Sequence, residues 1–291
     1  MISGKTGVLG VIGHPVAHSA SPAMHNAALA ATGLDYAYVP LHVLPAHAAQ
    51  VPAAMRALGI VGLNVTVPHK QAIMAGLDEI SEEAEQIGAV NTVVNRDGRL
   101  SGYNTDAHGV IASLQQDGGL DRLPPRVVVL GAGGAARAIL FALVQCPDVE
   151  HIDLLNRTVS KAQELALGLD PTARKIHVGG IDTAAARTAE AGLLINSTAV
   201  GMEPHAGVSP LADPTCLHDE LIVLDIVYKP LETLLLSQAR SAGARCLDGL
   251  GMLVHQGARS FEIWTGIKPP IDVMRRAVLE QAKAASPTEK P

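Results

Sequence analysis

The segment VVVLGAGGAARA, residues 127–138, constrains the fold of this chain more than any other stretch. A hydrophobic run leads into a glycine-rich turn and then into an Ala-rich helical pattern, which is the context that a dinucleotide-binding fingerprint requires. Gly131 permits a tight turn, Gly133 lets the backbone approach a pyrophosphate, and the small Ala136 allows close helix–strand packing. A glycine turn that serves packing alone is the alternative. The residues expected to contact a nucleotide are Gly131, Ala132, Gly133, Gly134 and Ala135.

The end of the next predicted strand favours NADP over NAD. The stretch IDLLNRT ends in Asn156, Arg157 and Thr158, whereas NAD-binding chains carry Asp or Glu at this place. Arg157 can form a charge-assisted fork to a 2′-phosphate, Thr158 adds a hydroxyl, and Lys161 adds a second cation. Charge-assisted hydrogen bonds contribute roughly 1.5–3 kcal/mol each, so we expect at least about a tenfold preference for NADP. A solvated basic helix start is the alternative.

Strand-like and helix-like segments alternate along the chain, which predicts an α/β fold with parallel strands. The length of 291 residues suggests two domains. The Gly/Pro-rich stretch 117–126 is a candidate boundary between them. Ser21 before Pro22 predicts a helix start with Ser21 as N-cap. The stretch DEISEEAEQIG, residues 78–88, predicts a helix with acidic residues early, and residues 89–104 predict a β-hairpin around Asp97-Gly98.

The composition excludes several classes of partner. Hydrophobic residues make up 48% of the chain, enough for a buried core, while the net charge of -6 disfavours nucleic acid and anionic membranes. Aromatic residues make up only 2%, so platforms for stacking bases are not expected. Three scattered cysteines form no disulfide or zinc pattern, and the N-terminus lacks the cleavage region of a signal peptide. We expect a cytoplasmic protein that acts on a small molecule.

Polar side chains gather at predicted strand ends in the first hundred residues, where α/β proteins bind ligands. In GLNVTVPHK, Asn64 and Thr66 share one strand face and Lys70 follows the strand end. A half-buried strand followed by an ordinary surface lysine would give the same pattern. Ser19 and Ser21 lie at the predicted helix start, where two hydroxyls suit a carboxylate, although Ser21 alone would explain capping. The remaining polar positions are Asn91 in GAVNTV and Asn104, Thr105 and Asp106 in GYNTD, of which Asp106 would serve equally as an N-cap.

These motifs together resemble the shikimate dehydrogenase family. Nine segments match in family order and cover nearly the whole chain: GHPVAHSASPAMHN, GLNVTVPHK, GAVNT, GYNTD, GAGGAARA, NRTVSKA, INSTAVGM, DIVYKP and DGLGMLVHQGARSFEIWTG. The resemblance implies two α/β domains. An N-terminal substrate-binding domain would comprise residues 1–106 plus 250–291, and a Rossmann-type NADP-binding domain with a parallel sheet would comprise residues 107–249.

The resemblance also implies an activity and a set of site residues. Family members reduce 3-dehydroshikimate to shikimate with NADPH, on the route to aromatic amino acids. Lys70 and Asp106 match the catalytic pair, and Ser19 and Ser21 match the residues that hold the substrate carboxylate. The other substrate-side matches are Asn64, Thr66, Asn91, Tyr228 and Gln256. Matches on the cofactor side are Gly131 to Ala135, Asn156, Arg157, Thr158, Lys161, Ile226, Gly249 and, more weakly, Glu82.

In the expected reaction, hydride passes between the nicotinamide and ring carbon C3 while Lys70 moves the proton on the attached oxygen. No metal is expected: His14, His18 and His25 lie close in sequence, but Pro15 prevents His14 and His18 from sharing a helix face. The alternatives are a quinate/shikimate or aminoshikimate dehydrogenase paralogue and a non-catalytic regulator that binds NADP and shikimate. Either a monomer or a homodimer would fit.

Overall fold

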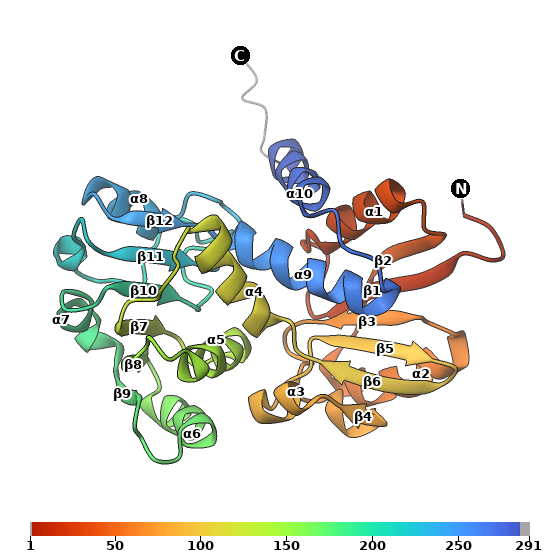
Figure 1. The fold of residues 1–291 in the computed structure, drawn as a ribbon, viewed down its shortest axis with the longest axis horizontal. Coiled ribbons are helices and arrows are strands. Elements are labelled where there is room, and N and C mark those ends of the chain that lie inside the picture. The colour runs from red at the N-terminus through yellow and green to blue at the C-terminus, as the bar shows by residue number, and fades with distance from the viewer. Residues whose placement is uncertain (1, 286–291) are drawn as a thin grey trace. The chain divides into compact units, whose positions relative to one another are not determined.

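The computed structural model describes residues 2–285 and separates into two compact α/β units (Figure 1). Unit 1 consists of the described residues within Met1–Gly109 and Val254–Pro291, and unit 2 consists of Val110–Leu253. Both chain crossings between the units lie inside helices: α4 (Asp106–Ala112) contains the first, and α9 (Gly249–Thr265) contains the second. Contacts within each unit define this division.

Unit 1 is built on a six-stranded mixed sheet with the strand order β2-β1-β3-β5-β6-β4. β1 pairs in parallel with β2 and β3, whereas β5 is antiparallel to both β3 and β6. The strands are β1 (Gly7–Gly13), β2 (Tyr36–His42), β3 (Gly62–Val65), β4 (Glu79–Ile80), β5 (Thr92–Arg96) and β6 (Arg99–Tyr103). The predicted hairpin is therefore present as β5 and β6, and Asp97 and Gly98 at its turn both have positive φ, as a tight two-residue turn requires.

Helices cover this sheet and enclose its core. They are α1 (Ser21–Thr32), α2 (Val51–Leu58), α3 (Glu82–Ile87), α10 (Ile271–Ala285) and parts of α4 and α9, and α10 packs along α1 (Figure 1). One core cluster joins Ile12, Leu63 and Val93 of the strands to Met55 of α2. Consecutive residues of β1 and β3 are buried on both faces of the sheet, and this cluster takes the side chains of one face.

Unit 2 is built on a fully parallel six-stranded sheet with the order β12-β11-β10-β7-β8-β9. Counted from β7 as the first strand, this is the 3-2-1-4-5-6 order of a Rossmann fold. The strands are β7 (Arg126–Leu130), β8 (His151–Asn156), β9 (Ile176–Gly180), β10 (Leu193–Asn196), β11 (Ile222–Asp225) and β12 (Arg245–Leu247). The helices are α5 (Gly134–Gln145), α6 (Val159–Leu169), α7 (Ala184–Thr188) and α8 (Leu234–Ser241).

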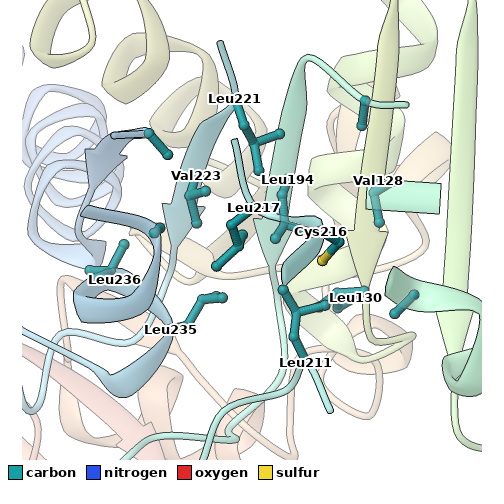
Figure 2. Close-up of a cluster of buried hydrophobic side chains, with 14 of the residues drawn as sticks. Val128, Leu130, Leu194, Leu211, Cys216, Leu217, Leu221, Val223, Leu235 and Leu236 are labelled. Atoms are coloured by element: carbon teal, nitrogen blue, oxygen red, sulfur yellow. The ribbon is translucent and has the colours of Figure 1, made fainter. Parts of the chain in front are cut away.

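The strands of unit 2 are almost continuously apolar because helices or packed segments cover the sheet. Figure 2 shows one such cluster, in which Val128 and Leu130 of β7, Leu194 of β10 and Val223 of β11 meet side chains from residues 211–236. All of these are at most 9% exposed. The expected fold class, two α/β units of which one has a Rossmann-type parallel sheet, is confirmed.

Three local expectations differ from the structure. The stretch 117–126 lies inside unit 2, so it is not the boundary between the units. The helix expected from residue 78 begins only at Glu82, because Glu79 and Ile80 pair with β6 and Ser81 caps the helix by accepting the N–H of Ala84 at 3.3 Å. The N-cap of α1 is Ala20 rather than Ser21. Among the described residues, no helix is both long and apolar enough to cross a membrane.

Candidate active site

Three strand ends of unit 1 bring polar residues to one edge of its sheet. In the strand register Asn64 of β3 lies opposite Thr92 of β5, and Thr92 lies opposite Tyr103 of β6. Because β5 runs antiparallel to its neighbours, its beginning meets the ends of β3 and β6. The residues just outside this row, Asn91 before β5 and Asp106 after β6, therefore converge on the same place.

Lys70 and Asp106 form a hydrogen-bonded ion pair at this edge. The side chains are only 14% and 8% exposed, respectively, so the pair is largely shielded from water. The backbone of Lys70 is fixed because its carbonyl accepts the N–H of Val90 at 2.8 Å. The neighbouring His69 is 1% exposed, and its Nε2 lies 2.7 Å from the carbonyl of Val43. The predicted catalytic pair is thus assembled by a turn that is anchored to the residue after β2 and to the segment before β5.

Asn91 orients the Asp106 carboxylate. Its Nδ2 donates to Oδ1 of Asp106 at 2.8 Å, while its Oδ1 accepts the backbone N–H of Thr105 at 2.8 Å and lies 2.9 Å from the hydroxyl of Thr92. The amide orientation is therefore determined, because reversing it would place an NH₂ group against a backbone N–H. The backbone N–H of Asp106 donates to Oδ1 of Asn104 at 3.0 Å, which anchors the main chain that carries this carboxylate.

Asn64 is buried beneath the same edge and is bonded on both sides of its amide. Its Oδ1 accepts the hydroxyl of Tyr38 at 2.7 Å, and its Nδ2 donates to Oγ of Ser260 at 3.0 Å. Burial raises the pKa of Tyr38 well above its ordinary value, so this phenol remains a donor. His25 stacks on the Tyr38 ring with centroids 4.4 Å apart, and burial lowers the pKa of His25 to about 3, which leaves the imidazole neutral.

The two serines at the start of α1 have different local roles. Oγ of Ser19 accepts the N–H of Ser21 at 3.2 Å, so Ser19 satisfies an amide of the first helical turn. Ser21 is 7% exposed and its hydroxyl contributes to the surroundings of Tyr38. Thr66 is partly exposed directly after β3, and its N–H donates to the carbonyl of Ile12 at 2.9 Å. Ser19 and Thr66 lie in the loops that follow β1 and β3, and Ser21 begins the helix after the first of these loops; the parallel pairing of β1 and β3 places both strand ends at one edge.

The helix α9 contributes Gln256, whose Oε1 lies 3.5 Å from Nδ2 of Asn91. One turn later on the same helix, Ser260 contacts Asn64, Thr92 and Thr105. Sequence reasoning named Thr105 only as a polar position without a role, and it missed the contributions of Thr92 and Ser260 to this network. Their signal was present as adjacency to Asn91 and Asp106 and as the four-residue spacing from Gln256, which places two polar side chains on one helix face.

In unit 2 the glycine-rich turn has the shape that a nucleotide needs. Gly131 has φ of 102°, and a Cβ there would lie 2.8 Å from Cγ2 of Thr198, so only glycine fits. Gly133 has open space where a side chain would stand, and α5 begins at the next residue. Backbone amides at a helix start with an open approach fit a pyrophosphate. Ala132, Gly134 and Ala135 complete this turn.

The cationic residues expected at the 2′-phosphate follow β8 directly. Nδ2 of Asn156 donates to the carbonyl of Thr158 at 2.8 Å and so shapes the turn. Arg157, Thr158 and Lys161 are exposed around the start of α6, and the strand end carries no carboxylate. The donor set therefore fits an anionic phosphate at the position where an NAD site would place an acid.

The segment after β11 brings together the residues expected near the nicotinamide. A Cβ on Gly249 would lie 2.2 Å from the carbonyl oxygen of Ile226, so these two positions pack backbone to backbone. Tyr228 follows two residues later on the same segment. Asp225 fixes the segment by accepting from Asn196 at 2.9 Å, the Val227 N–H at 3.1 Å and the Thr233 hydroxyl at 2.7 Å. Burial nevertheless raises the pKa of Asp225 above its usual range.

Glu82 and the histidines have local partners. Glu82 is the first residue of α3 in unit 1, and its Oε1 accepts from Gln86 at 3.2 Å. Nδ1 of His14 lies 2.7 Å from Nε2 of His42 and the two rings stack. Within residues 2–285, no group of three or more His, Cys, Asp or Glu side chains is arranged to hold a metal ion.

Two family models match the chain. Residues 11–93 match the shikimate dehydrogenase substrate-binding domain, and residues 249–279 match the shikimate 5'-dehydrogenase C-terminal domain. The chain is also 49% identical over 277 residues to a shikimate dehydrogenase (NADP(+)) of Symbiobacterium thermophilum, covering 94% of this chain and 93% of that protein. The chain belongs to the shikimate dehydrogenase family. The resemblance inferred from the sequence motifs is therefore confirmed.

Solved structures agree with this family. A crystal structure of a shikimate dehydrogenase in complex with NADP+ has a TM-score of 0.90 at 44% identity, covering 97% of this chain and 98% of the other. A quinate dehydrogenase of Corynebacterium glutamicum in complex with NAD has a TM-score of 0.87 at 34% identity, covering 94% and 99%. The family thus includes proteins with different ring substrates and cofactors on one fold.

Proposed function

We propose that this chain is an NADP-dependent shikimate dehydrogenase that reversibly reduces 3-dehydroshikimate to shikimate. The observation that carries the proposal is the shielded Lys70–Asp106 pair, with the orientation of Asp106 fixed by Asn91. A proton donor next to an oriented carboxylate is what reduction of a ring ketone needs, and a protein that only binds its ligand has no use for one. Family membership supports the substrate, and the motif at residues 131–136 supports the cofactor.

The roles of the side chains follow from their donors. Lys70 donates a proton to the ketone oxygen as hydride reaches C3, and it accepts that proton in the reverse direction. Asp106 orients Lys70 and accepts from the same substrate hydroxyl. Asn64, Thr66, Asn91, Tyr228 and Gln256 bind the ring hydroxyls, while Ser19 and Ser21 hold the carboxylate. Each buried polar group also excludes analogues that lack its partner, because such an analogue would leave the group unpaired.

Unit 2 would hold the cofactor, and NADPH supplies the hydride when bound. The turn at residues 131–135 would contact the pyrophosphate, and Asn156, Arg157, Thr158 and Lys161 would surround the 2′-phosphate. Ile226 and Gly249 would face the nicotinamide, and Glu82 remains a weaker prediction. Accordingly we propose a substrate-binding domain of residues 1–106 plus 250–291 and an NADP-binding domain of residues 107–249, close to the borders of units 1 and 2.

The decisive measurement is nicotinamide absorbance with purified protein, shikimate and NADP+, with parallel arms that replace shikimate by quinate or NADP+ by NAD+. We expect rapid NADPH formation from shikimate and at least about tenfold weaker use of NAD+. The reason is that Arg157 can form charge-assisted bonds to the 2′-phosphate of NADP, which NAD+ lacks. Saturable binding of shikimate and NADP+ without turnover in any arm would instead indicate a regulator and overturn the proposed activity.

Oxidation of quinate is the second candidate activity, favoured by the likeness to the quinate dehydrogenase structure. Family members that use quinate often carry Thr at the position of Ser21, so the serine supports shikimate. Turnover of quinate but not shikimate would retain the site and mechanism and overturn this interpretation of Ser21.

The setting of the enzyme is also proposed. Three free cysteines fit a reducing compartment, which supports a cytoplasmic location. Membership in the shikimate dehydrogenase family supports a place in aromatic amino acid biosynthesis. A monomer or a homodimer is expected, and sedimentation equilibrium would distinguish the two.

A further inference from the structure

Ser260 is a buried hydroxyl that joins helix α9 to the ends of three strands. It is 0% exposed, and its Oγ lies 2.7 Å from the hydroxyl of Thr92 and 3.2 Å from the hydroxyl of Thr105. It also accepts from Nδ2 of Asn64 at 3.0 Å. Thr92 is the first residue of β5, Thr105 follows β6, and Asn64 lies on β3. One side chain therefore contacts residues at the ends of β3, β5 and β6.

The hydrogen-bonding capacity of a hydroxyl determines the direction of these contacts. A serine hydroxyl has one proton and two lone pairs. Oγ of Ser260 donates its proton to the carbonyl of Gln256 at 3.1 Å, so its lone pairs remain to accept from Asn64 and from one threonine. Asn64 must then present its NH₂ group to Ser260 and its oxygen to Tyr38, as observed. The same NH₂ group donates to the backbone carbonyl of Asn91 at 3.2 Å and lies 3.3 Å from the hydroxyl of Thr92, so Ser260 is one of the acceptors that hold the Asn64 amide.

The same hydroxyl reaches Asn91 through the threonines. Thr92 and Thr105 both contact Oδ1 of Asn91, at 2.9 Å and 3.2 Å. Ser260 lies between these two hydroxyls and limits which of them can donate to Asn91. Asn91 in turn orients Asp106. A chain of hydrogen bonds thus leads from Ser260 to the carboxylate of the catalytic pair.

Burial alone does not explain this arrangement. Ser113 in unit 2 is 1% exposed, yet its hydroxyl has no hydrogen-bond partner among the described residues. A serine inside a helix can also satisfy itself with the carbonyl four residues earlier, which Ser260 does. The three further contacts of Ser260 exceed what its own burial requires.

We propose that Ser260 is a positioning residue that anchors the amide of Asn64 directly and supports Asn91 through Thr92 and Thr105, so that both amides stay in place to bind the substrate ring. Ser260 itself does not touch the substrate. The hydrogen bonds of Ser260 carry its effect on the two amides. Only its effect on shikimate affinity rests on the proposed function.

The first test measures the amides directly, without any reaction. In protein labelled with ¹⁵N-asparagine, Ser260→Ala should speed hydrogen exchange of the Asn64 side-chain NH₂ by at least about tenfold, because one buried hydrogen bond is lost. Ser113→Ala is the matched control, and the Asn95 side chain, which donates to the carbonyl of Ile60 at 3.0 Å, is the internal reference. Trp264, the only tryptophan in the sequence, reports through its fluorescence whether unit 1 is folded. Unchanged exchange at Asn64 in folded Ser260→Ala protein would overturn the proposal.

The second test concerns affinity. Ser260→Ala should raise KM for shikimate about tenfold and leave KM for NADP+ unchanged, whereas Ser113→Ala should change neither. Adding Thr92→Val to Ser260→Ala should cost less than the two separate effects together, because both variants break one network. Equal rises in both KM values, or additive effects, would indicate general damage and contradict the proposal. Absence of turnover in the unaltered protein would refute the proposed activity while the exchange experiment still decides the role of Ser260.

Discussion

At the scale of single residues, the pair of Lys70 and Asp106 leaves hydrogen-bonding capacity for a substrate. A lysine amine has up to three donors, of which one is used by Asp106. The Asp106 carboxylate accepts from Lys70 and Asn91, and a carboxylate has about four acceptor sites in all. One substrate hydroxyl can therefore contact both side chains at once. This geometry lets Lys70 move a proton while Asp106 holds the oxygen in place.

The role of Lys70 predicts a specific kinetic result. Lys70→Ala should lower kcat by about 10²–10⁴-fold, the usual contribution of a positioned proton donor, and leave KM for shikimate nearly unchanged. Lys5→Ala is the control, since Lys5 is a surface lysine of the same unit. Steady-state absorbance of NADPH measures both constants. Surviving turnover with a large rise in KM would make Lys70 a binding residue instead.

At the scale of elements, the sequence predicts the strands and helices well where one local pattern decides them. Residues 7–13 and 127–130 are apolar runs with glycines at their ends, and both are strands. The sequence pattern predicts helix at Glu79 and Ile80, but in the structure these residues pair with Ser101 and Gly102 of β6. The sequence also gives no sign of the role of Ser260, because a polar residue inside a helix is common and its partners Asn64 and Thr92 are distant in the sequence. Both failures involve partners distant in the sequence.

Two helix caps differ in what else their hydroxyls contact, and this difference predicts different stabilities. Thr233 caps α8 by accepting the N–H of Leu236 at 3.3 Å and donates to buried Asp225 at 2.7 Å. Ser81 caps α3, and its hydroxyl has no second side-chain contact among residues 2–285. Thr233→Val should reduce the free energy of unfolding of unit 2 by about 2–3 kcal/mol, because a charged group also loses a donor. Ser81→Ala should cost unit 1 about 1 kcal/mol. Urea denaturation followed by circular dichroism measures both, and equal losses would show that the Asp225 contact adds nothing.

At the scale of the whole molecule, the order of motifs along the chain indicates the fold better than any single motif does. The glycine-rich turn at residues 131–136 predicts the Rossmann-type sheet of unit 2, because strand, turn and helix must occur together there. The return of α9 to unit 1 gives no local signal, since nothing in its pattern states which sheet it covers. Only the match of Gln256 and its neighbours to the family places that helix with Asn64 and Asn91 in advance. Local physics thus predicts the elements, and the resemblance predicts their assembly.

His25 should make the stability of unit 1 depend on pH. The imidazole is 0% exposed, neither ring nitrogen has a hydrogen-bond partner within residues 2–285, and burial lowers its pKa from 6.5 to about 3. Between these values the unfolded chain binds a proton that the folded unit does not, so the contribution of His25 to the free energy of unfolding is highest above pH 6.5 and falls as the pH falls toward 3. The slope from this one group is about 1.4 kcal/mol per pH unit.

Urea denaturation followed by Trp264 fluorescence tests this dependence, since the Trp264 ring lies 5.3 Å from His25 between centroids. Relative to the unaltered protein, His25→Leu should lower the slope of the free energy of unfolding against pH, between about pH 5 and pH 6, by the amount that uptake of about one proton contributes. His47→Gln, at an exposed histidine of the same unit, is the control and should keep the slope. Other buried groups contribute equally to both variants, so the difference isolates His25. An unchanged slope in His25→Leu would mean that the pKa of His25 is not lowered in the folded protein. The charged imidazole would then find a partner or water, because its stack on Tyr38 opens before the unit unfolds.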